Sequence, residues 1–149
     1  MSVSLRFLYL HCRDLDSVRH FYSELIGLEE VHFSPEEAVA YRCGQLQFTV
    51  LRTDQPLPAV TQWAMQPGWK GGTSSLPSWS VECSKPAFDR AVRRLQEAGV
   101  PSRHASPVWV GYWSFPVRDP MGWTVELSCP TDGPDEPERR SAELGMGSP

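Results

Sequence analysis

One carboxylate in the sequence stands where it could bind a ligand, transfer a proton or help to hold a metal ion. Residues 123–129 alternate between apolar and polar side chains, with Trp123, Val125 and Leu127 against Thr124, Glu126 and Ser128. That alternation predicts a strand with Glu126 on its polar face. The alternative is a carboxylate that only faces solvent or accepts hydrogen bonds.

The residues just before this strand predict a tight turn. Residues 119–122 read Asp-Pro-Met-Gly. Pro120 fixes φ at one corner, and Gly122 accepts the positive φ that a tight reversal needs. The strand that carries Glu126 should therefore begin immediately after the turn.

A second candidate group lies near the N-terminus. Residues 5–12 predict a strand with Phe7, Tyr9 and His11 on one face. His11 could bind a metal or a ligand at the end of this strand, and Phe7 and Tyr9 could form part of a cavity wall. A lone histidine at a strand end is at least as often satisfied by backbone carbonyl groups.

Tryptophans form a third group of candidates. The predicted strand at residues 108–117 has aromatic side chains on both faces, so either face would present a large ring to a cavity, including Trp109 or Trp113. Packing within a core is the alternative. Residues 67–72 could form a flexible lid carrying Trp69, or an ordinary surface loop.

The elements that must position these groups occur twice. A strand at residues 5–12, a helix from Leu15 to Gly27 capped by Asp14, and strands at 28–33, 38–43 and 45–52 form one unit. A strand at 78–84, a helix from Pro86 to Gly99, and strands at 100–104, 108–117 and 123–129 repeat the order. Gly27-Leu28 and Gly99-Val100 occupy the same place in their units, which indicates an internal repeat of two βαβββ modules.

This repeat gives the domain organisation. We predict a first module at residues 1–52, a connecting loop at 53–77 and a second module at 78–129. The loop is rich in Pro, Gly, Ser and Thr, and an ordered connection of that length often covers a site; residues 59–65 suggest one short helical turn in it. Residues 130–149 carry almost no large apolar side chain, so we expect a disordered tail.

Composition excludes several classes of protein. The 149 residues carry a formal net charge of -4 at pH 7, which provides no basic surface for nucleic acid or an anionic membrane. We find neither a signal peptide nor an apolar stretch that could cross a bilayer, and we expect a cytoplasmic protein. The four cysteines are widely spaced and form no Cys-x-x-Cys pair, so no zinc knuckle is indicated.

Three segments make this chain similar to the vicinal oxygen chelate superfamily, which includes glyoxalase I, extradiol dioxygenases and bleomycin resistance proteins. They are residues 11–16 with Phe21-Tyr22 on the following helix, Gly27-Leu28 at its end, and residues 118–127. The resemblance covers roughly residues 5–129. It implies an α+β fold in which two tandem βαβββ modules form a cup-shaped mixed sheet, and a homodimer.

The resemblance also implies which positions would hold a metal ion. In the metal-dependent members, a His from the first strand and a Glu, Gln or His from the last strand of each module face the cup. Phe7 and a position near Ser78 take the places of the two His, and Gln47 and Glu126 take the last-strand places. A divalent site usually needs about three good donors, so we expect no metal and no cofactor.

The leading hypothesis is a glyoxalase/bleomycin-resistance-like protein that binds a small, partly aromatic molecule without metal. Its cavity would be lined by Phe7, Tyr9, His11, Gln47, Trp109, Trp113 and Glu126. The alternative is a metal-dependent lyase, isomerase or dioxygenase that uses Glu126 with His11 and Gln47. A third hypothesis is a non-catalytic module whose sheets only mediate assembly; a cavity filled by its own side chains would favour it.

Overall fold

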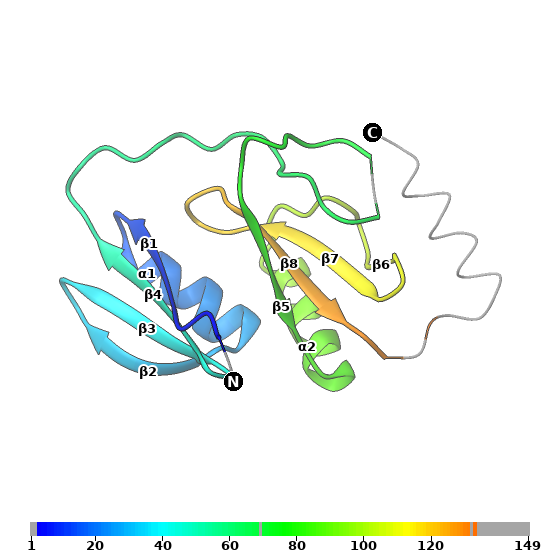
Figure 1. The fold of residues 1–149 in the computed structure, drawn as a ribbon, viewed down its shortest axis with the longest axis horizontal. Helices are drawn as coiled ribbons and strands as arrows, with labels where there is room; N and C mark the ends of the chain where they lie inside the picture. The colour runs from blue at the N-terminus through cyan, green and yellow to red at the C-terminus, as the bar shows by residue number, and fades with distance from the viewer. Residues whose placement is uncertain (1–2, 69, 132, 134–149) are drawn as a thin grey trace. The chain divides into compact units, whose positions relative to one another are not determined.

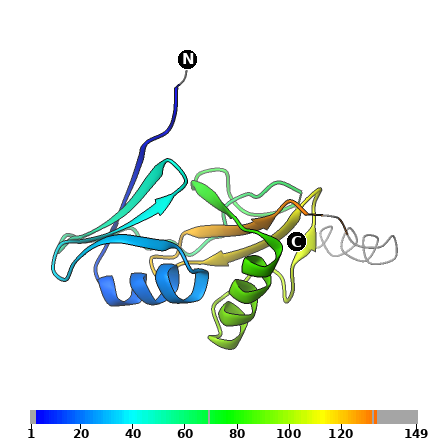
Figure 2. The same ribbon diagram turned by 90° about the horizontal axis from the view of Figure 1, so that it is seen from below.

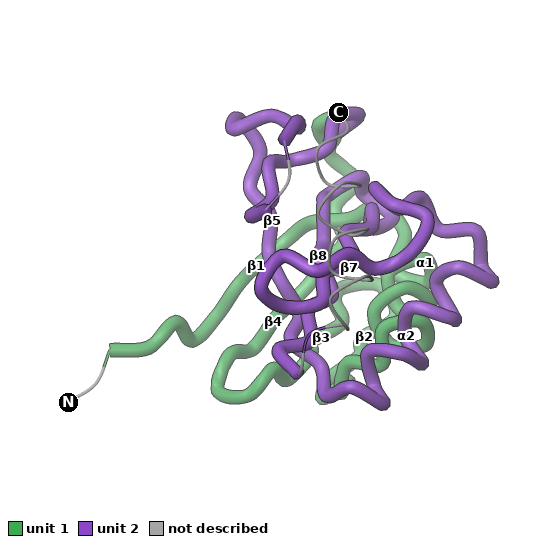
Figure 3. Tube along the Cα trace, turned by 90° about the vertical axis from the view of Figure 1, so that its right-hand side faces the viewer, with its two compact units in different colours: residues 1–59 green, residues 60–149 purple. Residues whose placement is uncertain are grey.

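The chain forms two compact units, Met1–Ala59 and Val60–Pro149 (Figure 3). The computed structural model describes residues 3–68, 70–131 and 133. Each unit contains one four-stranded mixed sheet and one helical segment. The predicted α+β fold with two βαβββ modules is confirmed. The predicted disordered tail at residues 130–149 lies almost entirely outside the described residues. Trp69 also lies outside them.

The first module has the strand order β1-β4-β3-β2, with β1 parallel to β4 and the other pairs antiparallel (Figure 1). Its elements are β1 (Phe7–Cys12), α1 (Leu15–Arg19), η1 (His20–Ile26), β2 (Glu29–Ser34), β3 (Ala38–Cys43) and β4 (Leu46–Arg52).

The predicted helix of this module starts and ends where the sequence places it. Asp14 caps it by accepting a 3.0 Å hydrogen bond from the Asp16 N–H, and Gly27 ends it. From His20 onward the turns widen into a π-helix, and the Gly27 N–H reaches back five residues to the Tyr22 carbonyl. Helix and sheet meet where the Tyr22 ring packs 5.1 Å from the Phe48 ring, edge to face.

The second module repeats this plan with the order β5-β8-β7-β6. In Figure 2, helix α2 covers one face of its sheet; Phe88 and Leu95 of that helix are fully buried, as are Phe115 and Leu127 of the sheet. The elements are β5 (Ser78–Glu82), α2 (Lys85–Glu97), β6 (Val108–Trp109), β7 (Trp113–Arg118) and β8 (Thr124–Cys129). No helix in the described residues is long and apolar enough to cross a membrane.

Two strand predictions in the second module are wrong. Residues 100–104 form a single bridge, Ser102 to Val117, instead of a strand. Pro101 and Pro107 lack the N–H that a longer ladder would need. Residues 108–117 form two short antiparallel strands, β6 and β7, because the chain reverses around Gly111. That reversal creates a turn that carries Tyr112.

The described residues of the connection, 53–68 and 70–77, form no helix, so the predicted turn of helix at residues 59–65 is also wrong. Ala64 instead forms an isolated bridge to Thr73 and donates its backbone N–H to Thr124 Oγ1 at 2.9 Å. The second unit begins at Val60, so most of the connection belongs to it.

Candidate functional site

The predicted turn at residues 119–122 forms and fixes the start of β8. One carboxylate oxygen of Asp119, Oδ1, accepts 2.9 Å hydrogen bonds from the backbone N–H groups of Met121 and Trp123. Gly122 has φ +92°, the left-handed region that glycine tolerates. A β-carbon there would lie 2.5 Å from the Val60 carbonyl oxygen, so the turn also packs tightly against the connection.

Glu126, on the strand that follows, is buried and hydrogen-bonded by hydroxyl groups. The residue is only 2% exposed. Ser114 donates to Oε2 at 2.6 Å, and the Tyr112 hydroxyl lies 3.2 Å from Oε1 and 3.0 Å from Oε2. Among the described residues, no Lys, Arg or His forms an ion pair with this carboxylate. A buried carboxylate held only by neutral donors is suited to meet a positive charge on a ligand.

The two donors come from the hairpin that the sequence does not predict. Tyr112 lies in the turn between β6 and β7, and Ser114 is the second residue of β7 and is 1% exposed. Burial, with the Glu126 charge acting in the same direction, raises the pKa of Tyr112 to about 12. The phenol therefore stays protonated at neutral pH and remains a hydrogen-bond donor to the carboxylate.

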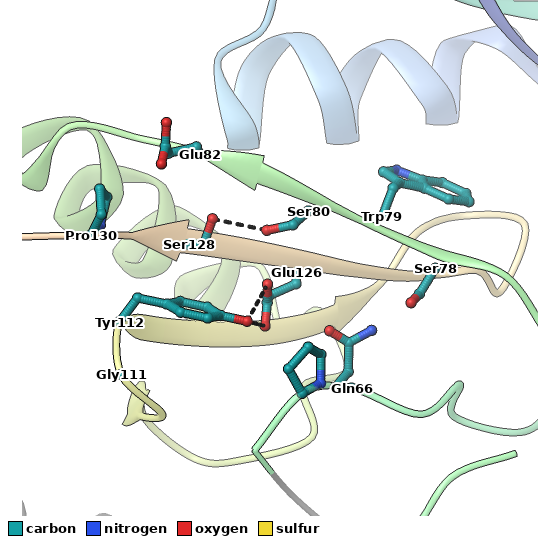
Figure 4. Close-up of a pocket in the computed structure, with 11 residues that line it drawn as sticks. Gln66, Ser78, Trp79, Ser80, Glu82, Gly111, Tyr112, Glu126, Ser128 and Pro130 are labelled. Carbon is teal, nitrogen blue, oxygen red and sulfur yellow. Dashed lines mark hydrogen bonds between the residues drawn. The ribbon is translucent and has the colours of Figure 1, made fainter. Parts of the chain in front are cut away.

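These groups lie at a cavity of about 550 Å³ within the second unit (Figure 4). That volume is within the range of small-molecule sites. Its polar lining comes from β5, β8, the hairpin turn and the connection, and includes Gln66, Ser78, Ser80, Tyr112, Glu126 and Ser128. The hypothesis of a non-catalytic module that only mediates assembly predicts a cavity filled by its own side chains. The cavity of the second module is open instead.

Gln66 belongs to the connection and is 7% exposed. Figure 4 shows its side chain directed toward the strands that carry Ser78 and Glu126. The amide has no hydrogen-bond partner among the described residues, although the residue lines the cavity. Buried amides are normally hydrogen-bonded, so this side chain is available for a bound molecule.

Three contacts join the connection to β7 and β8, and a fourth lies within the connection. Besides the bond from Ala64 to Thr124, the Arg118 guanidinium donates to the Thr61 carbonyl and lies 4.7 Å from the centre of the Trp63 ring. The Met65 N–H donates to the Thr73 carbonyl at 3.0 Å. Through Gln66 and Pro67 the connection forms part of the cavity wall.

The tryptophans of the hairpin lie on the other face of the sheet. In the β7–β8 register, Pro116 is opposite Glu126 and Ser114 is opposite Ser128, whereas Trp113 is opposite Cys129. Strand residues alternate between faces, so Trp113 faces away from Glu126. Trp109 packs against it, with ring centres 5.6 Å apart. Neither ring lines the cavity; its aromatic lining residues are Trp79 and Tyr112, of which Tyr112 is hydrogen-bonded to Glu126.

The predicted residues of the first module share one face of its sheet. Phe7, Tyr9 and His11 are the exposed residues of β1, and the Phe7 and Tyr9 rings stack with centres 5.9 Å apart. Gln47 is paired with Phe7 in the parallel register, while His11 is paired with Leu51, four residues further along. Four residues of strand span about 13 Å. The structure therefore does not bring His11 and Gln47 together.

The donors present do not fit the divalent metal site of metal-dependent relatives. In the first module the register pairs Phe7 with Gln47. In the second it pairs Ser80 with Glu126, so the first-strand position beside the carboxylate is Ser80, two residues beyond the expected Ser78. Each module thus offers one oxygen donor from its last strand and no histidine beside it. Among the described residues, no cluster of three or more His, Cys, Asp or Glu could hold a metal ion.

Comparison with known proteins agrees with this architecture. The family model of the Glyoxalase/Bleomycin resistance protein/Dioxygenase superfamily matches residues 5–127. Comparison with curated protein sequences finds no match.

Solved structures share the fold at low sequence identity. A glyoxalase/dioxygenase from Nostoc punctiforme is 18% identical with a TM-score of 0.67, over 87% of this chain and 92% of that chain. A lactoylglutathione lyase from Agrobacterium tumefaciens is 24% identical with a TM-score of 0.57, over 86% and 94%. The fosfomycin resistance protein FosX from Mesorhizobium loti is 16% identical with a TM-score of 0.62, over 88% and 95%.

Proposed function

Because this chain belongs to the glyoxalase/bleomycin resistance protein/dioxygenase superfamily, we propose that it is a small-molecule binding protein of that superfamily. Its ligand is a small, partly aromatic molecule with a positively charged nitrogen, held in the Glu126 cavity without a metal ion. The observation that carries this proposal is the Glu126 carboxylate, buried at the cavity and hydrogen-bonded only by the Tyr112 and Ser114 hydroxyls among the described residues.

The charge of Glu126 favours a cationic ligand. Removing a carboxylate from water is costly, and two hydroxyl donors offset only part of that cost. A ligand ammonium or amidinium group that reaches Oε1 or Oε2 would supply the missing positive charge. The Tyr112 ring lies at the same place and adds an aromatic surface for the cation and for an attached ring.

Gln66 adds a second polar contact. Its amide carries both donors and an acceptor, so it can bond to a carbonyl, hydroxyl or amide of the ligand. A molecule that joins a cationic nitrogen, a ring and one neutral polar group would satisfy Glu126, Tyr112 and Gln66 together. In this proposal the residues of the first module, Phe7, Tyr9, His11 and Gln47, and the tryptophans Trp109 and Trp113 are not the primary contacts.

The test compares three small aromatic molecules whose polar group is positive, neutral or negative. Benzylamine, benzyl alcohol and benzoate are titrated into the protein, and binding is followed by calorimetry and by backbone amide chemical shifts. We expect benzylamine to bind most tightly, with shifts at Tyr112, Ser114 and Gln66. Glu126→Gln should weaken benzylamine binding about 30-fold, since losing one partner of a buried charge pair costs roughly 2 kcal/mol or more.

Glu97→Gln is the matched control, because Glu97 is an exposed acid on α2 outside the cavity. It should leave benzylamine affinity unchanged. Equal binding of benzyl alcohol and benzylamine, or an unchanged affinity in Glu126→Gln, would refute the assignment. Stoichiometric iron, nickel, manganese or zinc that survives dialysis against chelator would refute the metal-free part of the proposal and favour a metal-dependent activity.

We further expect a homodimer, as is common in this superfamily. Light scattering coupled to size exclusion would give twice the 16.8 kDa chain mass. A monomer at all concentrations would exclude it.

A further inference from the structure

A second cavity, of about 380 Å³, lies within the first module. The charged side chains that line it are Arg6 and Arg42, and the lining includes no carboxylate. Phe7, Gln45 and Gln47 supply an aromatic ring and two amides. The cavity therefore concentrates positive charge and hydrogen-bond donors around one exposed ring.

The sheet register arranges these residues in a row. Gln47 of β4 is paired with Phe7 of β1 on one side and with Arg42 of β3 on the other. Adjacent strands are about 4.8 Å apart, so the Phe7 and Arg42 backbones lie about 10 Å apart with Gln47 between them. The Arg6 carbonyl accepts a 2.7 Å hydrogen bond from the Gln47 N–H, which ties the segment before β1 to the same place.

Among the described residues, neither arginine forms an ion pair with an acidic side chain. Arg42 lies opposite Glu29 in the β2–β3 register, yet the two form no ion pair, and Glu29 does not line the cavity. The Arg6 guanidinium lies 5.2 Å from the centre of the Phe7 ring, a contact that orients the group and leaves its charge free. By contrast, Arg19 and Arg52 of the same module are paired with Glu30 and Asp54.

We propose that this cavity is an oxyanion-binding site, in which Arg6 and Arg42 bind the carboxylate or phosphate group of a small organic molecule. A guanidinium presents paired N–H donors that match both oxyanions, and two of them across one cavity can hold a group between them. The exposed Phe7 ring contacts the apolar body of the ligand. The lining of this site comes from the first unit and that of the Glu126 cavity from the second, and the proposal does not depend on the function proposed for Glu126.

Phenyl phosphate and benzoate are the probes, and benzyl alcohol is the neutral control. Binding to the full chain is measured by calorimetry and by backbone amide chemical shifts. We expect one or both anions to shift the amides of Gly44, Gln45 and Gln47, while benzyl alcohol does not. Arg6→Gln and Arg42→Gln should each weaken the affinity about tenfold or more, as expected for loss of a charge-assisted bond. The tighter of the two anions identifies the oxyanion class.

Arg13→Gln is the matched control, because it removes the same charge from an exposed position of the first module outside the cavity. Its affinity for phenyl phosphate should be that of the parent protein. Arg42→Lys keeps the charge without the planar fork and should give an intermediate affinity. An equal loss in Arg13→Gln, shifts confined to other residues, or no binding of either anion at millimolar concentration would overturn the proposal.

Discussion

The two modules place different chemistry at the same position of the same strand plan. In the first module, the last strand carries Gln47, an exposed amide beside Phe7 and Arg42. In the second, the last strand carries Glu126, a buried carboxylate beside Ser80 and Pro116. The sheet order fixes where the position lies, and the side chains around it decide what it can bind.

The turns account for much of that difference. The β2–β3 turn of the first module contains only Pro35, Glu36 and Glu37, whereas the corresponding β6–β7 turn brings Tyr112 to Glu126. The two cavities also have opposite charge: Arg6 and Arg42 line one, and Glu82 and Glu126 line the other. Repetition of a fold thus leaves each copy free to acquire its own ligand class.

The largest expected difference in unfolding free energy between the modules comes from substitutions at two glycines. Gly122 and Gly44 both have positive φ, but a β-carbon at Gly122 would meet Val60, whereas one at Gly44 would meet no atom within 4 Å. Gly122→Ala should lower the free energy of unfolding by about 3 kcal/mol, from backbone strain plus the clash. Gly44→Ala should cost about 1 kcal/mol, from strain alone.

Urea unfolding of the two variants and the parent protein measures both losses. Similar losses at the two sites would mean that the turn before β8 can move away from the connection.

Hydroxyl groups beside the buried carboxylate give the next largest effect. Ser114→Ala removes a 2.6 Å donor from a carboxylate with no charged partner among the described residues, and should cost about 2 kcal/mol of unfolding free energy. Ser80→Ala removes an exposed bond to Ser128 on the same face and should cost about 0.5 kcal/mol or less. Chemical denaturation compares them, and a larger loss in Ser80→Ala would contradict the role given to Glu126.

An acid of the first module provides the contrast with Glu126, because it is neutralised by an arginine. Glu30 accepts hydrogen bonds from Arg19 at 3.2 and 3.0 Å and from Ser23 at 2.9 Å. These partners, Arg19 first, lower the pKa of Glu30 below its ordinary value of 4.5. Glu30→Gln should cost about 1 kcal/mol at neutral pH, since the pair is partly exposed.

The pH dependence follows from the direction of that shift. The stabilisation by Glu30 is fully present above pH 4.5 and is lost as pH falls through its lower pKa in the folded protein. The difference between Glu30→Gln and the parent should therefore shrink below pH 4.5 in denaturation curves. A difference for Glu30→Gln that stays constant to pH 2 would exclude the ion pair as its cause.

Asp89→Asn, which breaks the exposed Lys85–Asp89 pair, should change the free energy of unfolding by about 0.3 kcal/mol.

The sequence predicts those parts of the fold that depend on local chemistry. The Asp119–Gly122 turn, the alternation that turns Glu126 to one face, and the helix from Asp14 to Gly27 all follow from residue type and spacing. The strand predictions fail where prolines and Gly111 interrupt a segment that is otherwise apolar. Periodicity cannot distinguish one long strand from a tight hairpin when aromatic residues occupy both faces.

The surroundings of the site depend on contacts between distant residues. The sequence identifies Glu126 as a candidate, but it gives no sign that Gln66, 60 positions earlier, would line the same cavity. In the sequence, Tyr112 is one of several aromatic residues in the run at 108–115. Which of Tyr112, Trp109 and Trp113 lies beside Glu126 depends on the face that β7 turns toward Glu126. Only the pairing register of β7 with β8 determines that face.

The bond from Ala64 to Thr124 gives the connection a measurable rate of opening. The Ala64 N–H is fully buried and donates to a hydroxyl two positions before Glu126 on the same strand. Its hydrogen can exchange with deuterium only when the connection leaves the sheet. The exchange rate of this one amide therefore reports the local unfolding that uncovers Gln66. A ligand that contacts both Gln66 and Glu126 should slow the exchange in proportion to the ligand's occupancy.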